Sequence, residues 1–188
     1  MYRAGSLVCL RNNINPHDSS KVVEVFEKLN MRFEPNDHRQ HIFLNEEEVT
    51  PLLHSPEVTA IVPIVAAHKE VRSVAKEQQR KIGLKKDTVM TGRDIGSEIF
   101  PEAKLKFFIT ASTEVRAQRR FDQLKKVKPE ITYEEVLNQM LERDKQDSER
   151  EASPMRIPEG AVVVDTSDKT IEESVSILLG HYQKVFEI

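Results

Sequence analysis

The chain has 188 residues, of which 31% are charged and 38% are hydrophobic, a globular composition sufficient for one domain with a substantial core. Its formal net charge of -3 argues against binding nucleic acid by bulk electrostatics, so any anion site must be local. The single cysteine, Cys9, excludes an internal disulfide and indicates a reducing compartment, which predicts a cytoplasmic protein. The longest apolar run, at 60–67, is too short to span a bilayer, and the first residues lack a signal-peptide cleavage pattern.

Two helices are expected at the start of the chain. Apolar residues recur with helical spacing at 1–10, and again at 22–29. Asp18 and Ser19 precede the second of these segments and can cap its first turn. Asn30 is a suitable residue to end it.

A small sheet and a long helical segment are expected next. Short β-prone runs separated by polar turns at 31–50 predict an antiparallel insert. Helical spacing returns at 57–82, where Pro63 is expected to kink or break the helix and Gly83 to close it.

The second half of the chain alternates strands with helices. Short apolar runs predict strands at 88–90, 105–110 and 161–165. The last two runs are nearly continuous, which is typical of parallel strands covered on both faces. Helical spacing is present at 113–127, 132–150 and 168–185, and the second of these opens with a capping box of Thr132 and Glu135. This order predicts an α/β domain with crossover connections.

Charged residues gather in three places, and each group has two interpretations. Arg143, Asp147 and Arg150 are spaced by four and three residues, so a helix would place them on one stripe. The stripe fits a solvated face joined by ion pairs, or a site where the arginines hold phosphate and the aspartate orients a hydroxyl. The pair Arg93-Asp94 fits a structural ion pair, but its place after a predicted strand favours ligand binding. The third group, a basic cluster, is either a surface face or a second anion site and comprises Arg116, Arg119 and Arg120.

No metal site is predicted. His38 and His41 lie three residues apart without the adjacent glutamate pattern of a metal-binding helix. Cys9 lies in an apolar, helix-like segment and is expected to be a small buried hydrophobe rather than a reactive thiol.

Taken together, these residues resemble the bacterial cytidylate kinases, a family of nucleoside monophosphate kinases, over nearly all of the chain. The resemblance is carried by five short stretches in a fixed order: Tyr2-Arg3, 65–67 with Val71-Arg72, 92–96 with Phe100-Pro101, 116–120 with Gln123-Leu124, and 142–150 with Pro154.

The resemblance implies a fold and a division of the chain. The fold would be a P-loop kinase-like parallel sheet flanked by helices, truncated at its amino terminus and carrying a small antiparallel β insert. Residues 1–30 would belong to the core, 31–87 to the monophosphate-binding insert, and 88–188 to the core with a lid at about 116–131.

The resemblance also implies an activity, phosphoryl transfer from ATP with Mg²⁺ to CMP or dCMP by a monomeric enzyme. Arg3, Arg72, Arg93 and Arg150 would surround the monophosphate, Asp94 would contact the nucleoside, and Arg143 with Asp147 would contact the sugar. Arg93, Arg119 and Arg120 would act on the transferring phosphoryl group. Pro63 stands where the family usually has a hydroxyl residue that helps to read the cytosine base, so base selectivity would depend more on Arg72.

One family feature is missing from these residues, the phosphate loop G-x-x-x-x-G-K-[ST]. The backbone N–H groups and lysine of such a loop hold the phosphates of ATP, and its hydroxyl binds magnesium. We therefore expect the 188-residue chain alone to fold poorly and to lack kinase activity. Three alternatives remain open: a kinase whose natural start lies upstream, a CMP-binding module without catalysis, and a degenerate fragment.

Overall fold

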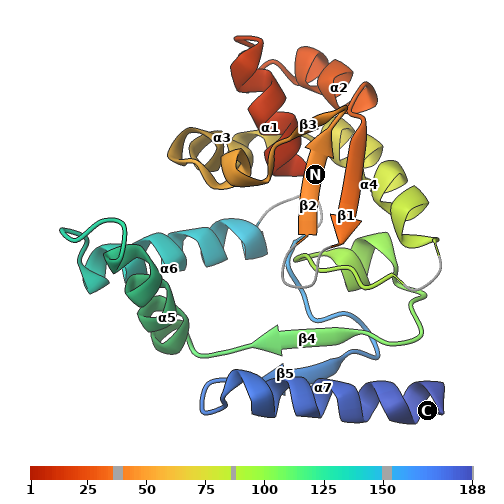
Figure 1. Cartoon of the computed structure of the whole chain (residues 1–188), viewed down its shortest axis with the longest axis vertical. Helices are drawn as coiled ribbons and strands as arrows, with labels where there is room; N and C mark the ends of the chain where they lie inside the picture. The colour runs from red at the N-terminus through yellow and green to blue at the C-terminus, as the bar shows by residue number, and fades with distance from the viewer. Residues whose placement is uncertain (36–39, 86–87, 150–153, 188) are drawn as a thin grey trace. The chain divides into compact units, whose positions relative to one another are not determined.

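The computed structural model describes residues 1–35, 40–85, 88–149 and 154–187. It divides into two compact units, Met1–Val89 and Met90–Ile188, and each is described by itself. The elements of both units are labelled in Figure 1.

The first unit contains four α-helices, namely α1 (Tyr2–Arg11), α2 (Ser19–Glu27), α3 (Pro56–Ala67) and α4 (Lys69–Gly83), with a short 3-10 turn, η1 (Thr50–His54). The predicted cap of α2 is confirmed, because the Asp18 carboxylate accepts a hydrogen bond from the backbone N–H of Lys21 at 3.2 Å. Ser55 caps α3 in the same way, with Pro56 in the first turn, where its missing N–H leaves no bond unmade.

The predicted antiparallel insert is confirmed. Strands β1 (Met31–Pro35), β2 (Gln40–Leu44) and β3 (Glu47–Glu48) form a sheet in that order. Asn45 begins the tight turn between β2 and β3 with a positive φ of 53°, a conformation that asparagine tolerates better than most residues.

Pro63 was expected to kink or break the helix, and the break is wrong. Pro63 lies inside α3, on an exposed part of the helix, so water can reach the carbonyl that its missing N–H leaves without a helical partner. The helical segment breaks instead at His68, which is extended at φ -68° and ψ 122°. The His68 ring Nε2 lies 2.8 Å from the carbonyl oxygen of Pro16, a contact that holds the break against the loop before α2.

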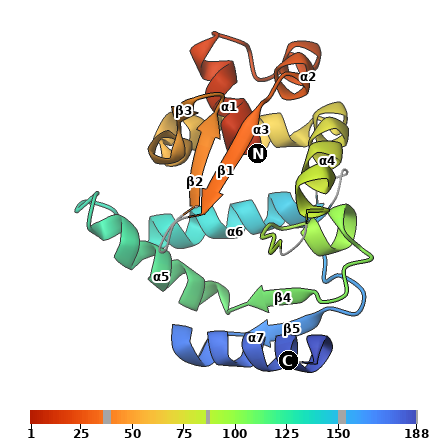
Figure 2. The same cartoon turned by 45° about the vertical axis from the view of Figure 1, so that its right-hand side comes forward.

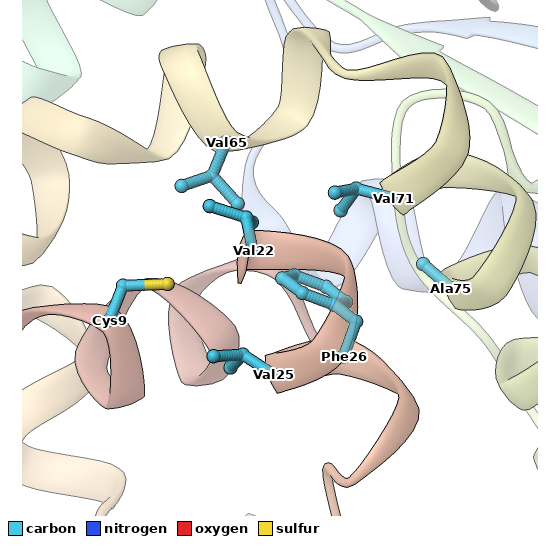
Figure 3. Close-up of a cluster of buried hydrophobic side chains, with 7 residues drawn as sticks. All are labelled: Cys9, Val22, Val25, Phe26, Val65, Val71 and Ala75. Carbon is cyan, nitrogen blue, oxygen red and sulfur yellow. The ribbon is translucent and has the colours of Figure 1, made fainter. Parts of the chain in front are cut away.

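Two apolar clusters form the core of the first unit. In the first, shown in Figure 3, Val22 and Phe26 of α2 face Val65 and Val71, and the cluster comprises Cys9, Val22, Val25, Phe26, Val65, Val71 and Ala75. Cys9 is fully buried there, which confirms its interpretation as a small hydrophobe, and burial raises the pKa of its thiol. The second cluster joins α1 to the sheet and to α3 through Ala4, Leu7, Leu44, Val49, Leu53 and Val58.

The second unit is built around two parallel strands, β4 (Phe107–Thr110) and β5 (Val162–Asp165), as predicted. The connection between them contains α5 (Thr113–Lys125) and α6 (Tyr133–Glu149), which pack side by side. The last helix, α7 (Ile171–Phe186), lies along the strands in Figures 1 and 2, and its His181 ring meets the Phe107 ring edge-on. The capping box of α6 is confirmed, with Thr132 and Glu135 exchanging hydrogen bonds of 2.9 and 3.2 Å.

Two expectations for the second half are wrong. Residues 88–90 form no strand in the described part of the chain, and Val89 is 92% exposed, because a three-residue run without a bonded neighbour is too short to persist. The expectation that both faces of strands β4 and β5 are buried is also wrong, since Ile109 is 58% exposed and Val163 is 51% exposed. Both strands are edges of a two-stranded sheet, so neither is enclosed as an inner strand would be.

Candidate functional site

Arg3, in the first turn of α1, joins this helix to the start of α3. Its guanidinium donates hydrogen bonds to the carbonyl oxygen of Leu53 at 2.8 Å and to the hydroxyl of Thr59 at 3.0 Å. These contacts fix the side chain in the first unit.

Arg72, in α4, is a cation in a nearly closed environment, since only 7% of the residue is exposed. Its guanidinium donates to the carbonyl oxygen of Ala66 at 3.2 Å and lies over the ring of Tyr2, 5.3 Å from the ring centre. Arg72 therefore contacts the first turn of α1, which also carries Arg3. Both arginines predicted to bind phosphate in the first unit thus lie at the start of the same helix.

Arg93 and Asp94 lie at the start of a single π-helical turn, η2 (Ile95–Ile99), instead of following a strand. The turn is formed by backbone bonds from Glu98 and Ile99 to the Asp94 carbonyl oxygen at 2.9 and 3.3 Å. Asp94 is 7% exposed. π-Turns are rare and frequent at functional sites, and nothing in the residue pattern predicted this one.

The guanidinium of Arg93 forms an ion pair with the carboxylate of Asp147 in α6. The two side chains are 35% and 12% exposed, so the pair is mostly removed from water. The carbonyl oxygen of Asp147 also accepts a hydrogen bond of 2.8 Å from the N–H of Met155. The structure thus brings together Arg93, Asp94 and Asp147, three of the predicted site residues.

A second charged group lies where α5 packs on α6. Arg116 pairs with Asp144 at 2.8 Å and also donates to the carbonyl oxygen of Ala111 at 3.0 Å. Partial desolvation of Arg143, and then the nearby charge of Arg120, lower the pKa of the Arg143 guanidinium below its ordinary range. Two cations close enough to repel each other are a natural place for an anion.

Arg119 is engaged differently from its neighbour Arg120. Its guanidinium donates to the carbonyl oxygen and the hydroxyl of Thr166 at 2.6 and 3.2 Å, and so holds the connection between β5 and α7. Arg120 is exposed and donates to the Gln123 side chain at 3.3 Å. The predicted catalytic role of both arginines stays a prediction.

Arg150 lies outside the described residues, as does His38, which was considered with His41 and not predicted to bind metal. His41 is described, and its ring Nδ1 lies 2.7 Å from the carboxylate of Glu48. Within the described ranges, no group of three His, Cys, Asp or Glu side chains could hold a metal ion. The described helices include none long and apolar enough to cross a bilayer.

The family model for cytidylate kinase matches residues 1–184. The chain belongs to the cytidylate kinase family. It is 44% identical to a cytidylate kinase of Carboxydothermus hydrogenoformans over 95% of this chain and 81% of the relative, and 43% identical to one of Caldanaerobacter subterraneus over 93% and 76%. The identity to the cytidylate kinase of Bacillus subtilis is 35%, over 95% of this chain and 80% of the relative. These matches confirm the resemblance stated for the sequence and place the chain among nucleoside monophosphate kinases.

Proposed function

We propose that this chain serves phosphoryl transfer from ATP to CMP or dCMP, which gives CDP or dCDP. Family membership supports the reaction class. The observation that carries the assignment of residues is the ion pair of Arg93 with Asp147, beside the buried Asp94. Asp94 is the residue that caps the π-turn and Asp147 lies in α6, so the backbone fixes the positions of both carboxylates.

Arginines would bind the phosphate of the acceptor nucleotide. Arg3, Arg72 and Arg93 would have this role, since a guanidinium donates to two phosphate oxygens in fixed directions. Asp94 would accept from the nucleoside. Arg150, outside the described residues, keeps its proposed place at the phosphate.

Asp147 would change partners when the nucleotide binds. In this structure its carboxylate is paired with Arg93. We propose that the phosphate takes over the Arg93 guanidinium while Asp147 accepts hydrogen bonds from the sugar hydroxyls and Arg143, one helical turn before it, donates to a sugar hydroxyl oxygen. Both Arg93 and Asp147 then keep a hydrogen-bonding partner after the exchange.

Phosphoryl transfer needs positioning and positive charge more than covalent help from the protein. Arg93, Arg119 and Arg120 would supply that charge. Arg120 has the better support, because it is exposed and its guanidinium bonds to the Gln123 side chain rather than to the backbone. To reach the phosphoryl group, Arg119 would have to break its hydrogen bond to the Thr166 carbonyl oxygen. Otherwise it would act indirectly, by holding the connection between β5 and α7.

We propose that the 188 residues by themselves do not hold the phosphates of ATP or its magnesium ion. The 188 residues contain no G-x-x-x-x-G-K-[ST] loop, and the described ranges hold no metal-binding cluster. Mg²⁺ would arrive as the complex with ATP. We propose that this chain by itself forms no CDP; the same observation favours a second candidate, a CMP-binding module without transfer.

We further propose that residues 31–87 act as the monophosphate-binding insert, and that 1–30 and 88–188 act as the core, with a lid at about 116–131. The proposed protein is a cytoplasmic monomer that binds CMP or dCMP and ATP, with no nucleic acid or membrane partner. A lid that excludes water would favour transfer to CMP over hydrolysis of ATP.

Two measurements on the purified chain test these proposals. Calorimetric titration with CMP should give a saturable signal that Arg93→Ala weakens at least tenfold, whereas Lys184→Ala, which removes an exposed charge of the same unit, leaves it unchanged. A coupled assay should detect no ATP-dependent CDP. Formation of CDP would refute the proposed inactivity and uphold the kinase reaction; absence of both CMP binding and CDP would contradict the proposed function.

A further inference from the structure

Arg72 is held from one side by an aromatic ring that none of the assigned roles includes. Its guanidinium carbon lies 5.3 Å from the centre of the Tyr2 ring, within the range in which the negative face of a ring attracts a cation. The same guanidinium donates to the Ala66 carbonyl oxygen at 3.2 Å. Because 7% of Arg72 is exposed, water contributes little to its solvation, and these two contacts matter more than they would at the surface.

The Tyr2 ring is in turn supported by Phe26. The two ring centres are 5.9 Å apart and their planes are tilted by 45°. Phe26 is fully buried in the first core cluster (Figure 3), and it packs against α1 where Gly5 has no side chain. A chain of contacts therefore runs from Gly5 through Phe26 and Tyr2 to Arg72, all within the first unit.

We propose that Tyr2 is a positioning residue, whose ring holds the Arg72 guanidinium in the orientation that receives the nucleotide. The inference rests on the proposed binding of CMP by Arg72. An unrestrained arginine loses side-chain entropy when a ligand binds. A side chain that a ring already holds in one orientation has less entropy left to lose on binding. Tyr2 thus raises the affinity for CMP without touching it.

The variants Tyr2→Leu and Tyr2→Phe distinguish the effect of the aromatic ring from the effect of apolar side-chain volume. Leucine keeps an apolar contact with Phe26 but has no ring face, whereas phenylalanine keeps the face and loses only the hydroxyl. Loss of a cation–ring contact of ordinary strength corresponds to about a 3- to 30-fold weaker CMP affinity. We expect Tyr2→Leu to show that loss by calorimetry and Tyr2→Phe to bind within about twofold of the parent chain.

A double-mutant cycle with Arg72→Met shows whether Tyr2 acts through Arg72. Methionine keeps much of the length and apolar contact of the arginine, and thermal unfolding of each variant identifies any that fails to fold. We expect Tyr2→Leu to have no further effect on CMP affinity when Arg72 is already methionine. Equal losses in both backgrounds, or equal losses for leucine and phenylalanine at Tyr2, would overturn the proposal.

The side-chain NMR signals of Arg72 provide a reading that does not depend on CMP. A guanidinium over a ring face has its δ-proton signals shifted upfield, and we expect Tyr2→Leu, but not Tyr2→Phe, to remove that shift. If the parent chain binds no CMP, the proposed function fails while this measurement still decides the positioning of Arg72. Unchanged δ-proton signals in Tyr2→Leu would reject the inference by themselves.

Discussion

Gly5→Ala sets two opposite effects against each other at one position of α1. Alanine favours a helix interior over glycine by about 1 kcal/mol, so propensity alone predicts a more stable first unit. However, a β-carbon at this position would lie closer than van der Waals contact to three ring carbons of Phe26, the farthest of them at 3.0 Å. Phe26 is fully buried, and its ring is rigid, so the strain cannot be relieved by a side chain that turns toward solvent.

Overpacking of this kind costs about 1–3 kcal/mol, and the contact with Phe26 is closer than side chains normally allow. We therefore expect Gly5→Ala to lower the free energy of unfolding by up to about 2 kcal/mol after the gain in propensity. The measurement is urea unfolding followed by circular dichroism. Phe26→Leu makes room for the added methyl group, so the double variant should lose less stability than the sum of the single variants.

Gly180→Ala is the matched control, because Gly180 lies inside α7 and a β-carbon there meets nothing within 4 Å. It should stabilise the second unit by about 0.5–1 kcal/mol through propensity alone. If Gly5→Ala stabilised the protein as much as Gly180→Ala does, the packing of Phe26 against α1 would be refuted, and with it the support of the Tyr2 ring.

Further predictions concern the charged residues. Asp147→Asn removes the charge opposite Arg93 and should lower the free energy of unfolding by about 1–3 kcal/mol; an unchanged urea midpoint would argue against the ion pair. Arg119→Ala should cost about 1–2 kcal/mol through its lost bonds at the β5–α7 connection, whereas Arg120→Ala should leave thermal stability unchanged. Hydrogen bonds from Ser20 and the Lys21 backbone lower the pKa of Asp18 from 3.8, so its capping contribution is complete above that value and is lost as the pH falls through the lowered pKa. The stability difference between the parent chain and Asp18→Ala should therefore shrink below about pH 4 in acid titrations, and a constant difference would contradict it.

Local signals in the sequence predicted the local structure well. Asp18 and Thr132 cap the helices expected to follow them, because a short polar side chain can satisfy the first backbone N–H groups without any tertiary partner. The continuous apolar runs at 105–110 and 161–165 contain the parallel strands β4 and β5. The antiparallel insert followed in the same way from alternating short runs and turns.

The errors arose where neighbours in space decide the outcome. Pro63 was expected to kink or break a helix. Its exposed position lets water replace the missing backbone bond, and the break occurs instead at His68, which contacts Pro16. The run at 88–90 has the composition of a strand without a partner to pair with in the described chain.

The residues of the candidate site were chosen from the family resemblance, and the contacts among them could not be predicted from the sequence. Arg93 and Asp147 were each proposed as ligands of a nucleotide, yet no spacing rule pairs two residues so far apart along the chain. The contact of Tyr2 with Arg72 was missed for the same reason, since an aromatic residue at a helix start is ordinarily a core residue.

Titration of the purified chain with CMP and with cytidine decides whether arginines of this chain bind the phosphate of a cytidine monophosphate. CMP should bind at least about tenfold more tightly than cytidine, because charge-assisted bonds from guanidinium groups to phosphate are each worth about 1.5–3 kcal/mol. Equal affinities for CMP and cytidine would mean that no arginine of the chain holds the phosphate.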